Sequence, residues 1–300
     1  MPELSIIIIS YNTKDITQHC LDTVLQSLKD DPKMQVEIIV LDNASTDGSK
    51  EMLLNYEKKL NNHHSIHLYF YPSTINLGFG PGNNEAVKYA RGKYLLFLNS
   101  DTEALDNAIS QLLTLYKQHN FDFAGAKLLN KDLTPQLSAS RFYSLPVAFA
   151  ALFLFADKWH FTRFSPSHIK KVDWLSGACF ITTKDRYEKL HGFDTKIFMY
   201  WEEVDLFYRA HLAGMTTGFF PHPRFIHLEG ASSASRTQPI LKVFQGYIYF
   251  YKKHCSPLQV SILKGMLQLK ALLSLAIGKA TGNTYLIETY SKAYEIAQDH

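Results

Sequence analysis

Cysteine is scarce in this sequence. Only Cys20, Cys179 and Cys255 occur in 300 residues, and no two of them form a CxxC pair. Zinc knuckles and disulfide frameworks need paired or regularly spaced cysteines, so this spacing excludes both. Isolated cysteines fit a protein of a reducing compartment.

Concentrated positive charge is also missing. The formal net charge is +3 and the sequence pI is about 8.5, without a long block of lysine and arginine. A dedicated nucleic-acid binder carries a basic patch, so we expect no nucleic-acid partner. Small anionic substrates are compatible with this charge.

Long hydrophobic runs are absent as well. The segment "VAFAALFLFA" (147–156) has ten uncharged residues, well short of the ~20 that cross a bilayer. We expect a core helix there; a membrane-dipping segment and part of an acceptor groove are the alternatives. The N-terminal "MPELSIIIIS" lacks a basic region, and its apolar run is too short for a signal peptide. We therefore expect it to belong to the fold of a cytoplasmic protein.

Short β-branched or aromatic runs alternate with helical stretches in the first half of the chain. We expect strands at 4–9, 36–42, 65–71, 93–99 and 121–129, and helices at roughly 15–29, 47–60, 80–91 and 104–118. Continuous apolar strands separated by helices predict an α/β fold with a mostly parallel central sheet and helices on both faces. Such a sheet binds its ligand at the carboxyl ends of the strands.

Polar residues collect at three of these strand ends: Tyr11 and Asn12 after the first strand, Asp42 and Asn43 after the second, Asn99 and Asp101 after the fourth. An aspartate at a buried strand end costs desolvation energy unless a cation meets it, and carboxylate oxygens suit Mg²⁺ or Mn²⁺. Two local alternatives exist. Ser45 or Thr46 would cap the helix that follows the second strand, and Asp101 would cap a helix beginning near Thr102.

The segment "NLGFGPGNN" (76–84) is rich in glycine. A dinucleotide-binding fingerprint belongs at the first strand-to-helix turn, but here that turn reads "SYNTKD" and contains no glycine. A dehydrogenase is therefore disfavoured. Instead, Gly78, Gly80 and Gly82 predict a tight bend that lies close to a bound group, with Asn84 opening the next helix face.

The segment "WEEVDLFYRAHLAG" (201–214) begins with carboxylates. Glu202, Glu203 and Asp205 fall in the first turn of a predicted helix, where the helix dipole favours negative charge. One explanation is a solvated helix end. The other is a general base beside Tyr200 and Trp201, whose apolar surroundings raise its pKa.

These segments occur in a recognisable order: "SIIIISYN", "VLDNASTDGS", "NLGFGPGNNEAVKYARGKYLLFLNSD", "WLSGACFITT", "GFDTKIFMYWEEVDL" and "HLEGASS". The order resembles the inverting GT-A glycosyltransferases of family 2, and within them the rhamnosyltransferase-like branch that builds bacterial surface polysaccharide. The resemblance covers residues 4–233. It implies a GT-A (nucleotide-diphospho-sugar transferase) catalytic domain at 1–235, with a nucleotide-sugar-binding half at 1–129 and an acceptor and catalytic half at 130–235. The C-terminal helical extension is expected at 236–300.

The resemblance also implies site residues. Asp42 would hydrogen-bond the base or ribose of the donor, and the other expected donor-binding residues are Tyr11, Asn12, Asn43, Asn76, Gly78, Asn84 and Asn99. Asp101 matches the last aspartate of the family's DxD metal motif, and Asn99 stands where the first aspartate would be, so the metal site has one negative charge fewer. His227, in "RFIHLEG", matches a histidine that contacts the metal or diphosphate; a structural histidine is the alternative.

The implied catalytic base is Glu203, which matches the second position of the family's acidic pair, usually an aspartate; Glu202 is the alternative base. The base would accept the proton of an acceptor hydroxyl as its oxygen attacks the anomeric carbon opposite the leaving nucleoside diphosphate, which inverts the configuration. Mg²⁺ or Mn²⁺ held by Asp101 and His227 would stabilise the diphosphate. Tyr200 and Trp201 are expected to stack on the acceptor sugar, unless they are ordinary core aromatics.

The implied activity is that of an inverting hexosyltransferase. It would move a sugar, with rhamnose favoured, from a dTDP- or UDP-linked donor to a glycan or lipid-linked acceptor. A catalytically silent subunit that binds a nucleotide or glycan is the alternative. A nucleotidyltransferase is disfavoured because the acidic and aromatic segment "MYWEEVDL" has no obvious role in the reaction of such an enzyme.

The C-terminal residues predict two helices, at 239–255 and 257–280. Lys264, Lys270 and Lys279 interrupt the otherwise apolar second helix. This pattern fits a membrane-surface helix, a packed helical hairpin and a homodimer interface alike. Transferases of this branch are expected to extend lipid-linked sugars, so the resemblance adds a peripheral position at the inner face of the cytoplasmic membrane as an alternative to a purely cytoplasmic one.

Overall fold

The computed structural model describes residues 1–60, 64–228 and 237–298. The chain forms two compact units. The first unit comprises residues 1–140, 164–198 and 202–232, and the second comprises residues 141–163, 199–201 and 233–300. The last residues of the "HLEGASS" segment and the expected domain boundary at 235/236 lie outside the described residues.

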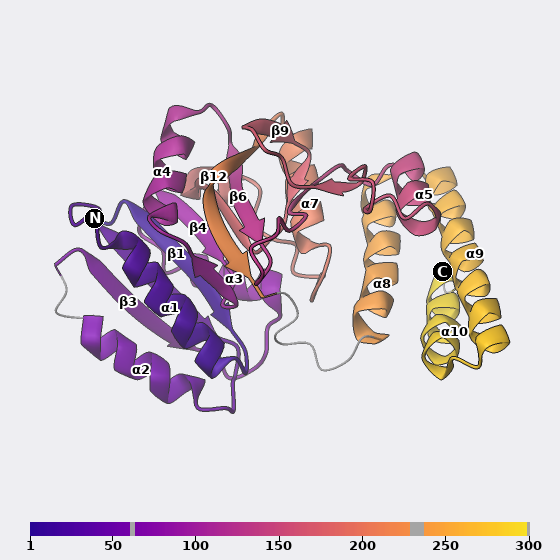
Figure 1. Cartoon of the computed structure of the whole chain (residues 1–300), viewed down its shortest axis with the longest axis horizontal. Helices are drawn as coiled ribbons and strands as arrows, with labels where there is room; N and C mark the ends of the chain where they lie inside the picture. The colour runs from indigo at the N-terminus through magenta and orange to yellow at the C-terminus, as the bar shows by residue number, and fades with distance from the viewer. Residues whose placement is uncertain (61–63, 229–236, 299–300) are drawn as a thin grey trace. The chain divides into compact units, whose positions relative to one another are not determined.

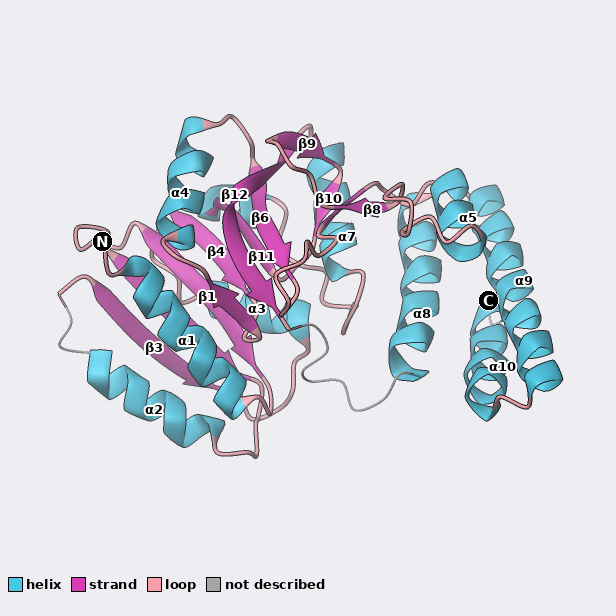
Figure 2. Cartoon of the chain, in the orientation of Figure 1, coloured by secondary structure: helices cyan, strands magenta, loops and turns pink. Residues whose placement is uncertain are grey.

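The first unit is built on a nine-stranded sheet with the order β3-β2-β1-β4-β11-β6-β12-β5, in which β9 also pairs with β12 (Figures 1 and 2). The strands are β1 (Leu4–Ser10), β2 (Val36–Asp42), β3 (Ile66–Pro72), β4 (Tyr94–Leu98), β5 (Thr102–Ala104), β6 (Phe123–Leu129), β9 (Lys170–Val172), β11 (Cys179–Thr183) and β12 (Thr217–His227). The strands β3, β2, β1 and β4 are mutually parallel, as are β6 and β12, whereas β11, β5 and β9 run antiparallel to their neighbours. This arrangement confirms the predicted mostly parallel α/β fold.

Short strands complete the list: β7 (Ala139–Ser140) pairs with β10 (Trp174–Leu175), and β8 spans Arg163–Phe164. The helices of the first unit are α1 (Lys14–Leu28), α2 (Ser49–Leu60), α3 (Phe79–Val87), α4 (Ala108–Gln118), α6 (Lys184–Lys189) and α7 (Glu202–Leu212).

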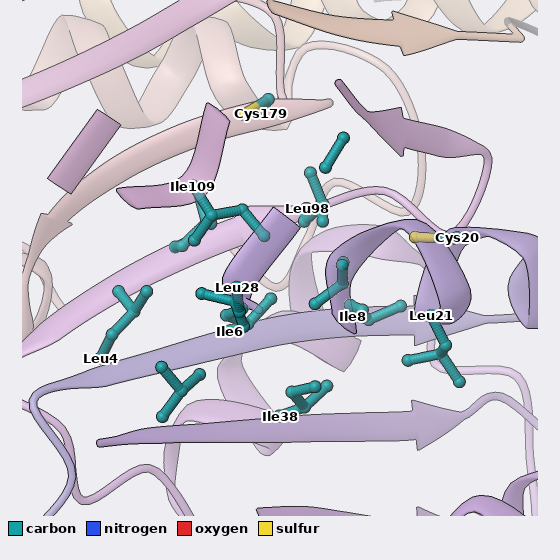
Figure 3. Packing of buried hydrophobic residues seen from close by; sticks show 14 of the residues in the cluster. Leu4, Ile6, Ile8, Cys20, Leu21, Leu28, Ile38, Leu98, Ile109 and Cys179 are labelled. Carbon is teal, nitrogen blue, oxygen red and sulfur yellow. The ribbon is translucent and has the colours of Figure 1, made fainter. Parts of the chain in front are cut away.

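One hydrophobic core lies between the sheet and α1, α2 and α4 (Figures 1 and 3). Side chains alternate along a strand, so Leu4, Ile6 and Ile8 of β1 point to this face and pack near Leu21 and Leu28 of α1 (Figure 3). Both faces of the central strands are covered, which explains why their sequences read as continuous apolar runs rather than as alternating ones.

A second core, rich in aromatic rings, lies on the other face. Phe97 of β4 stacks on Phe180 of β11 with ring centroids 4.6 Å apart, and Phe207 of α7 meets Phe180 edge to face at 5.4 Å. Phe193, from the loop after α6, packs edge to face against both Phe97 and Phe180. These contacts hold α7 against the sheet and so fix the position of its first turn.

Two expected helix caps are wrong. Residues 102–104 form β5, which pairs with β12, and the next helix begins only at Ala108, so Asp101 caps no helix there. At the start of α2, Asp47 rather than Ser45 or Thr46 accepts a hydrogen bond from the backbone N–H of Ser49, at 3.1 Å.

The second unit consists mainly of helices: α5 (Leu145–Phe153), α8 (Thr237–His254), α9 (Pro257–Thr281) and α10 (Thr284–Gln298) (Figure 2). A capping box between Ser256 and Gln259 starts α9, and Gly282, with φ +66°, ends it in the left-handed conformation. After this turn α10 packs antiparallel along α9, since Lys264 reaches Gln298 at the far end. The sequence predicted α8 and α9 but not α10.

Two segments of this unit differ from a simple core helix. In α5 only Ala148 and Ala150 are buried, whereas Phe149 is exposed, so the expectation of core burial for residues 147–156 is only partly met. Within the described residues, α9 is the one helix long and apolar enough to cross a membrane, judged by length and composition alone.

All three cysteines are free. Cys20 and Cys179 are buried in the core of the first unit (Figure 3), and burial raises the pKa of the Cys20 thiol to about 12 and that of Cys179 still further above its ordinary value. Cys255 is partly exposed between α8 and α9, and its partial burial raises its pKa as well.

Candidate active site

The ends of β1 and β2 are tied together by short side-chain hydrogen bonds. Asn12, with φ +50°, accepts at Oδ1 from the N–H of Thr46 at 2.8 Å, and its own N–H donates to Ser45 Oγ at 2.8 Å. The carboxylate of Asp42, only 2% exposed, accepts from the N–H of Ser45 at 2.9 Å. Tyr11 is exposed beside them. Two of the predicted donor-binding residues, Asn12 and Asp42, are therefore joined through the turn that contains Ser45 and Thr46.

The glycine-rich segment bends as its sequence predicts. Gly78 has φ +84°, and a Cβ there would lie 2.5 Å from the carbonyl oxygen of Phe198. Asn76 accepts from the N–H of Gly78 at 2.9 Å, and Asn43 donates to the carbonyl of Gly78 at 3.1 Å. Only glycine permits this close approach.

The side chain of Asn84 is hydrogen-bonded within the protein. Its Oδ1 accepts from the hydroxyl of Tyr187 at 2.6 Å and from the N–H of Phe193 at 2.8 Å, and its amide donates to the carbonyl of Phe193 at 2.8 Å. These bonds join α3 to α6 and the loop after it. A direct contact of Asn84 with a donor stays a prediction.

Asp101 and His227 lie side by side because β5 pairs with β12. Thr102 stands opposite His227 in this pairing, and the N–H of Leu228 donates to the carbonyl of Asp101 at 3.0 Å. As a result His227 Nε2 lies 3.4 Å from Asp101 Oδ1 and 3.5 Å from the side-chain nitrogen of Asn99. Asn99, Asp101 and His227 therefore lie together at one end of the sheet, although Asn99 and His227 are 128 positions apart in the sequence.

Gln136 fixes the orientation of the His227 ring. Nδ1 of His227 lies 2.8 Å from Gln136 Oε1, which can only accept, so Nδ1 carries a proton, and in the neutral ring Nε2 then presents a lone pair. The amide of Gln136 also donates to the carbonyl of His227, at 3.3 Å. The two lone-pair donors Asp101 Oδ1 and His227 Nε2 therefore face each other, an arrangement that a cation between them stabilises.

The donor set fits a divalent cation with oxygen and imidazole preferences. Besides Asp101 and His227, the buried Oδ1 of Asn99 has no hydrogen-bond partner among the described residues. One carboxylate and one imidazole suit Mn²⁺ or Mg²⁺, and the Asn99 amide, whose nitrogen faces His227 here, would add an oxygen ligand on turning over. No cluster of three or more His, Cys, Asp or Glu occurs in the described part of the chain.

The three carboxylates at the start of α7 have different surroundings. Asp205 is fully buried and binds Arg209 at 2.7 Å, and Arg209 also donates to the carbonyl of Gly192 at 2.7 Å, so Asp205 has a structural role. Glu202 is 4% exposed, and its Oε2 has no partner among the described residues. Burial, followed by the nearby charge of Glu203, raises the pKa of Glu202 well above its usual range. Glu203 is partly exposed.

The turn at 176–178 joins this helix start to the end of β4. The N–H of Asn99 donates to the carbonyl of Ala178 at 2.9 Å, and a Cβ on Gly177 would lie 3.8 Å from Cβ of Glu203. A Cβ on Gly80 would lie 3.5 Å from Cβ of Glu202. The glycine-rich segment, the Asn99 end of β4 and the start of α7 are therefore neighbours within the first unit.

Tyr200 and Trp201 belong to the second unit, and both have positive φ, at +65° and +78°. Trp201 is buried, and its ring packs 4.2 Å from the ring of Tyr247 and 5.1 Å from that of Tyr143. The alternative of a core aromatic thus describes the packing of Trp201, and an acceptor contact of either residue stays a prediction.

The sequence as a whole matches one protein family. The model of that family, described as glycosyl transferase family 2, aligns with residues 5–207. The chain belongs to glycosyl transferase family 2.

Curated family 2 relatives have related names. The chain is 35% identical over 128 residues to the poly(ribitol-phosphate) beta-glucosyltransferase of Bacillus spizizenii, covering 42% of this chain and 19% of that protein. It is 27% identical to rhamnosyltransferase WbbL of Escherichia coli, covering 74% and 82%. It is 25% identical to the N-acetylglucosaminyl-diphospho-decaprenol L-rhamnosyltransferase of Mycobacterium tuberculosis, covering 84% and 88%. For five curated relatives, the B. spizizenii protein among them, the match covers less than two thirds of the relative's own length.

A solved structure has the same fold. The mannosyltransferase PcManGT from Pyrobaculum calidifontis, in complex with GDP-Man and Mn²⁺, superposes with a TM-score of 0.58 at 16% identity, covering 99% of this chain and 85% of that chain. The predicted GT-A fold and the predicted membership of family 2, near its rhamnosyltransferases, are confirmed.

Within this family 2 site, sequence reasoning missed Gln136 and Ser45. Gln136 lies in a polar stretch without a motif, 91 residues before its partner His227, so no local pattern marks it. Ser45 was considered only as a helix cap, but it bridges Asn12 and Asp42. Its signal was present, since it lies three residues after a strand-end aspartate, where such bonds are common.

Proposed function

We propose that this chain transfers a sugar from a nucleoside-diphosphate donor to a hydroxyl of a glycan or lipid-linked acceptor, with inversion at the anomeric carbon. The observation that supports it most is the convergence of Asn99, Asp101 and His227 at the end of β4, next to the turn that borders Glu203. A silent nucleotide-binding subunit would not need an accessible carboxylate at that position.

The donor would bind at the carboxyl ends of β1, β2 and β4, and the half of the domain at 1–129 would supply most of its contacts. Asp42 and the turn around Asn12 would meet the nucleoside, and the Gly78 segment would lie along the diphosphate. A bound Mg²⁺ or Mn²⁺ would supply positive charge for the leaving diphosphate, and Asp101, His227 and Asn99 are the residues that would hold it.

Glu203 is the better candidate for the base. Burial and the charge of Glu203 raise the pKa of Glu202 well above its usual range, which favours its protonated form, and a protonated carboxyl cannot accept a second proton. Glu203 is partly exposed and would accept the proton of the acceptor hydroxyl as the C–O bond to the donor sugar forms and the bond to the diphosphate breaks. A neutral Glu202 also spares Glu203 the repulsion of a second charge.

The names of the relatives guide the choice of substrates. Two of the relatives are rhamnosyltransferases, and one name contains a diphospho-decaprenol acceptor. We therefore propose rhamnose on a dTDP or UDP carrier as the first donor to test, a lipid-linked sugar as the first acceptor, and a role in bacterial surface polysaccharide synthesis at the cytoplasmic side of the membrane.

The test combines donor binding with transfer. Purified protein is titrated with nucleotide sugars in the presence of Mn²⁺ and then assayed for transfer, and NMR of the product reports the anomeric configuration. Glu203→Gln should lower transfer by roughly 100- to 10,000-fold while donor binding persists, because only the base is lost. Asp101→Ala should weaken the Mn²⁺-dependent part of donor binding.

Matched controls are Glu51→Gln and Asp106→Ala, which change exposed carboxylates on the same unit. Normal transfer by Glu203→Gln would refute its assignment as the base. Donor binding without transfer to any acceptor, in the wild-type protein, would favour the silent subunit.

A further inference from the structure

The helix α9 has two apolar faces. Its inner face is buried and consists of Leu263, Leu267, Ala271, Ser274 and Gly278. Its opposite face carries six large apolar side chains that are exposed, and we call them the outer stripe: Leu258, Ile262, Leu269, Leu272, Leu273 and Ile277. At about 100° per residue the two sets fall on opposite sides of the helix. The hairpin with α10 therefore accounts for only one of the two faces.

Exposed apolar side chains are concentrated in the second unit. Among the residues that the structure describes, eleven of the eighteen exposed large hydrophobic ones lie in it, although it contains 94 of the 300 residues. Besides the outer stripe they are Phe149, Leu154, Phe155, Trp159 and Phe161. A surface of this composition marks a site of interaction rather than a surface that faces water.

Charge is divided between the two units as well. The ranges 141–163, 199–201 and 233–300 contain eleven lysines and arginines against four aspartates and glutamates, a net charge of +7. The remaining residues contain twenty against twenty-four, a net charge of −4. The mild charge of the whole chain thus conceals a strongly basic second unit.

On α9 itself the charge is of one sign. It contains Lys264, Lys270 and Lys279 and no acidic residue. Lys270 and Lys279 flank the outer stripe on opposite sides, each about a quarter-turn from its centre. A lysine side chain in that position can lay its methylene groups on an apolar surface while its ammonium group contacts anionic groups beside that surface.

We propose that the second unit docks on an anionic lipid surface, with α9 lying in the plane of the interface and the outer stripe entering the headgroup region. An exposed apolar stripe flanked by lysines is the composition of interfacial helices. Exposed Trp159 is of a type enriched at membrane interfaces, and phenylalanine is common on the apolar face of interfacial helices. The proposal does not depend on the sugar transferred, and its test measures no transfer.

Two other uses of the stripe fit less well. A spanning orientation would require α9 to leave α10, although Gln268 and Lys264 bond to the end of that helix. A second copy of this chain, packed stripe to stripe, would bring the lysines of both α9 helices together with no acidic residue on either to offset them. Charge complementarity favours anionic lipid.

The test uses the full chain and sedimentation with vesicles. Binding to phosphatidylcholine vesicles that contain phosphatidylglycerol should exceed binding to pure phosphatidylcholine by on the order of tenfold or more, and added salt should weaken it. The double variant Leu269→Gln with Leu273→Gln should lower this binding by on the order of tenfold, because each buried methylene contributes to the partition.

The matched control is Leu133→Gln with Leu212→Gln, which changes two exposed leucines of the first unit and should bind vesicles as the wild type does. Light scattering reports the mass of each protein. Equal binding to both lipid compositions, or equal binding of the outer-stripe variant and the wild type, would overturn the proposal. So would a wild-type dimer that the outer-stripe variant dissociates while neither protein binds vesicles.

Discussion

Replacing Glu202 by glutamine should change how the stability of the protein depends on pH. Glu202 is buried at the start of α7, its Oε2 has no partner among the described residues, and burial together with the charge of Glu203 raises its pKa well above the usual range. The folded protein therefore keeps a proton that the unfolded chain releases near pH ~4.3.

The sign of the effect follows from this difference. Because folding raises the pKa, the stabilisation from the bound proton is complete below the unfolded-state pKa and is lost as the pH rises through the folded-state pKa. Each pH unit in that interval lowers the free energy of unfolding of the wild type by about 1.4 kcal/mol relative to the glutamine variant. Two pH units within it therefore change the difference by about 3 kcal/mol.

Urea unfolding followed by circular dichroism, at a series of pH values between roughly 5 and 8, measures this difference. Titrating groups that the two proteins share largely cancel in the comparison, and Glu51→Gln, an exposed glutamate of α2, supplies the flat reference. A difference between the wild type and Glu202→Gln that stays constant with pH would refute the reasoning, since it would mean that Glu202 is ionised in the folded protein.

Two further substitutions test residues that hold the site in its conformation. Gln136→Leu removes the acceptor for His227 Nδ1–H and should weaken Mn²⁺ binding, measured by electron paramagnetic resonance, by roughly 10- to 100-fold; Gln136→Glu keeps an acceptor and should retain binding. If Gln136→Leu binds Mn²⁺ normally, the orienting role is wrong. Gly78→Ala should lower the free energy of unfolding by about 1–3 kcal/mol more than Gly214→Ala, because both glycines have positive φ but only Gly78 has a neighbouring carbonyl, that of Phe198, in the way. Equal losses in thermal melts would show that the Phe198 contact relaxes without cost.

The sequence predicted the parts of the fold that depend on local pattern. The strands β1, β2, β3, β4 and β6 begin and end within about two residues of the expected ranges, because continuous apolar runs mark strands buried on both faces. The sequence did not predict segments whose structure depends on residues far away in the chain. The three residues of β5 form a strand only because β12 lies beside them, and the sequence suggested a helix cap at that point as an alternative to metal binding.

The same distinction applies to the site. Asp101 and His227 were identified by resemblance to a family, and the pairing of β5 with β12 explains why they meet. The role of Gln136 could not be predicted from the sequence, because it rests on a contact with His227 that only the folded chain makes. The different surroundings of Glu202 and Glu203 were also beyond the sequence, since adjacent residues on a helix point in different directions and only one of this pair is buried.

The three cysteines offer a practical consequence. Thiol reagents attack the thiolate, so buried Cys20 and Cys179 with their raised pKa values should react slowly. Cys255 is the most accessible of the three and lies two residues before the first residue of α9. A maleimide dye should therefore attach there first, in the unmodified protein. An environment-sensitive fluorophore at this position would follow the encounter of α9 with vesicles in real time, without a single amino-acid substitution.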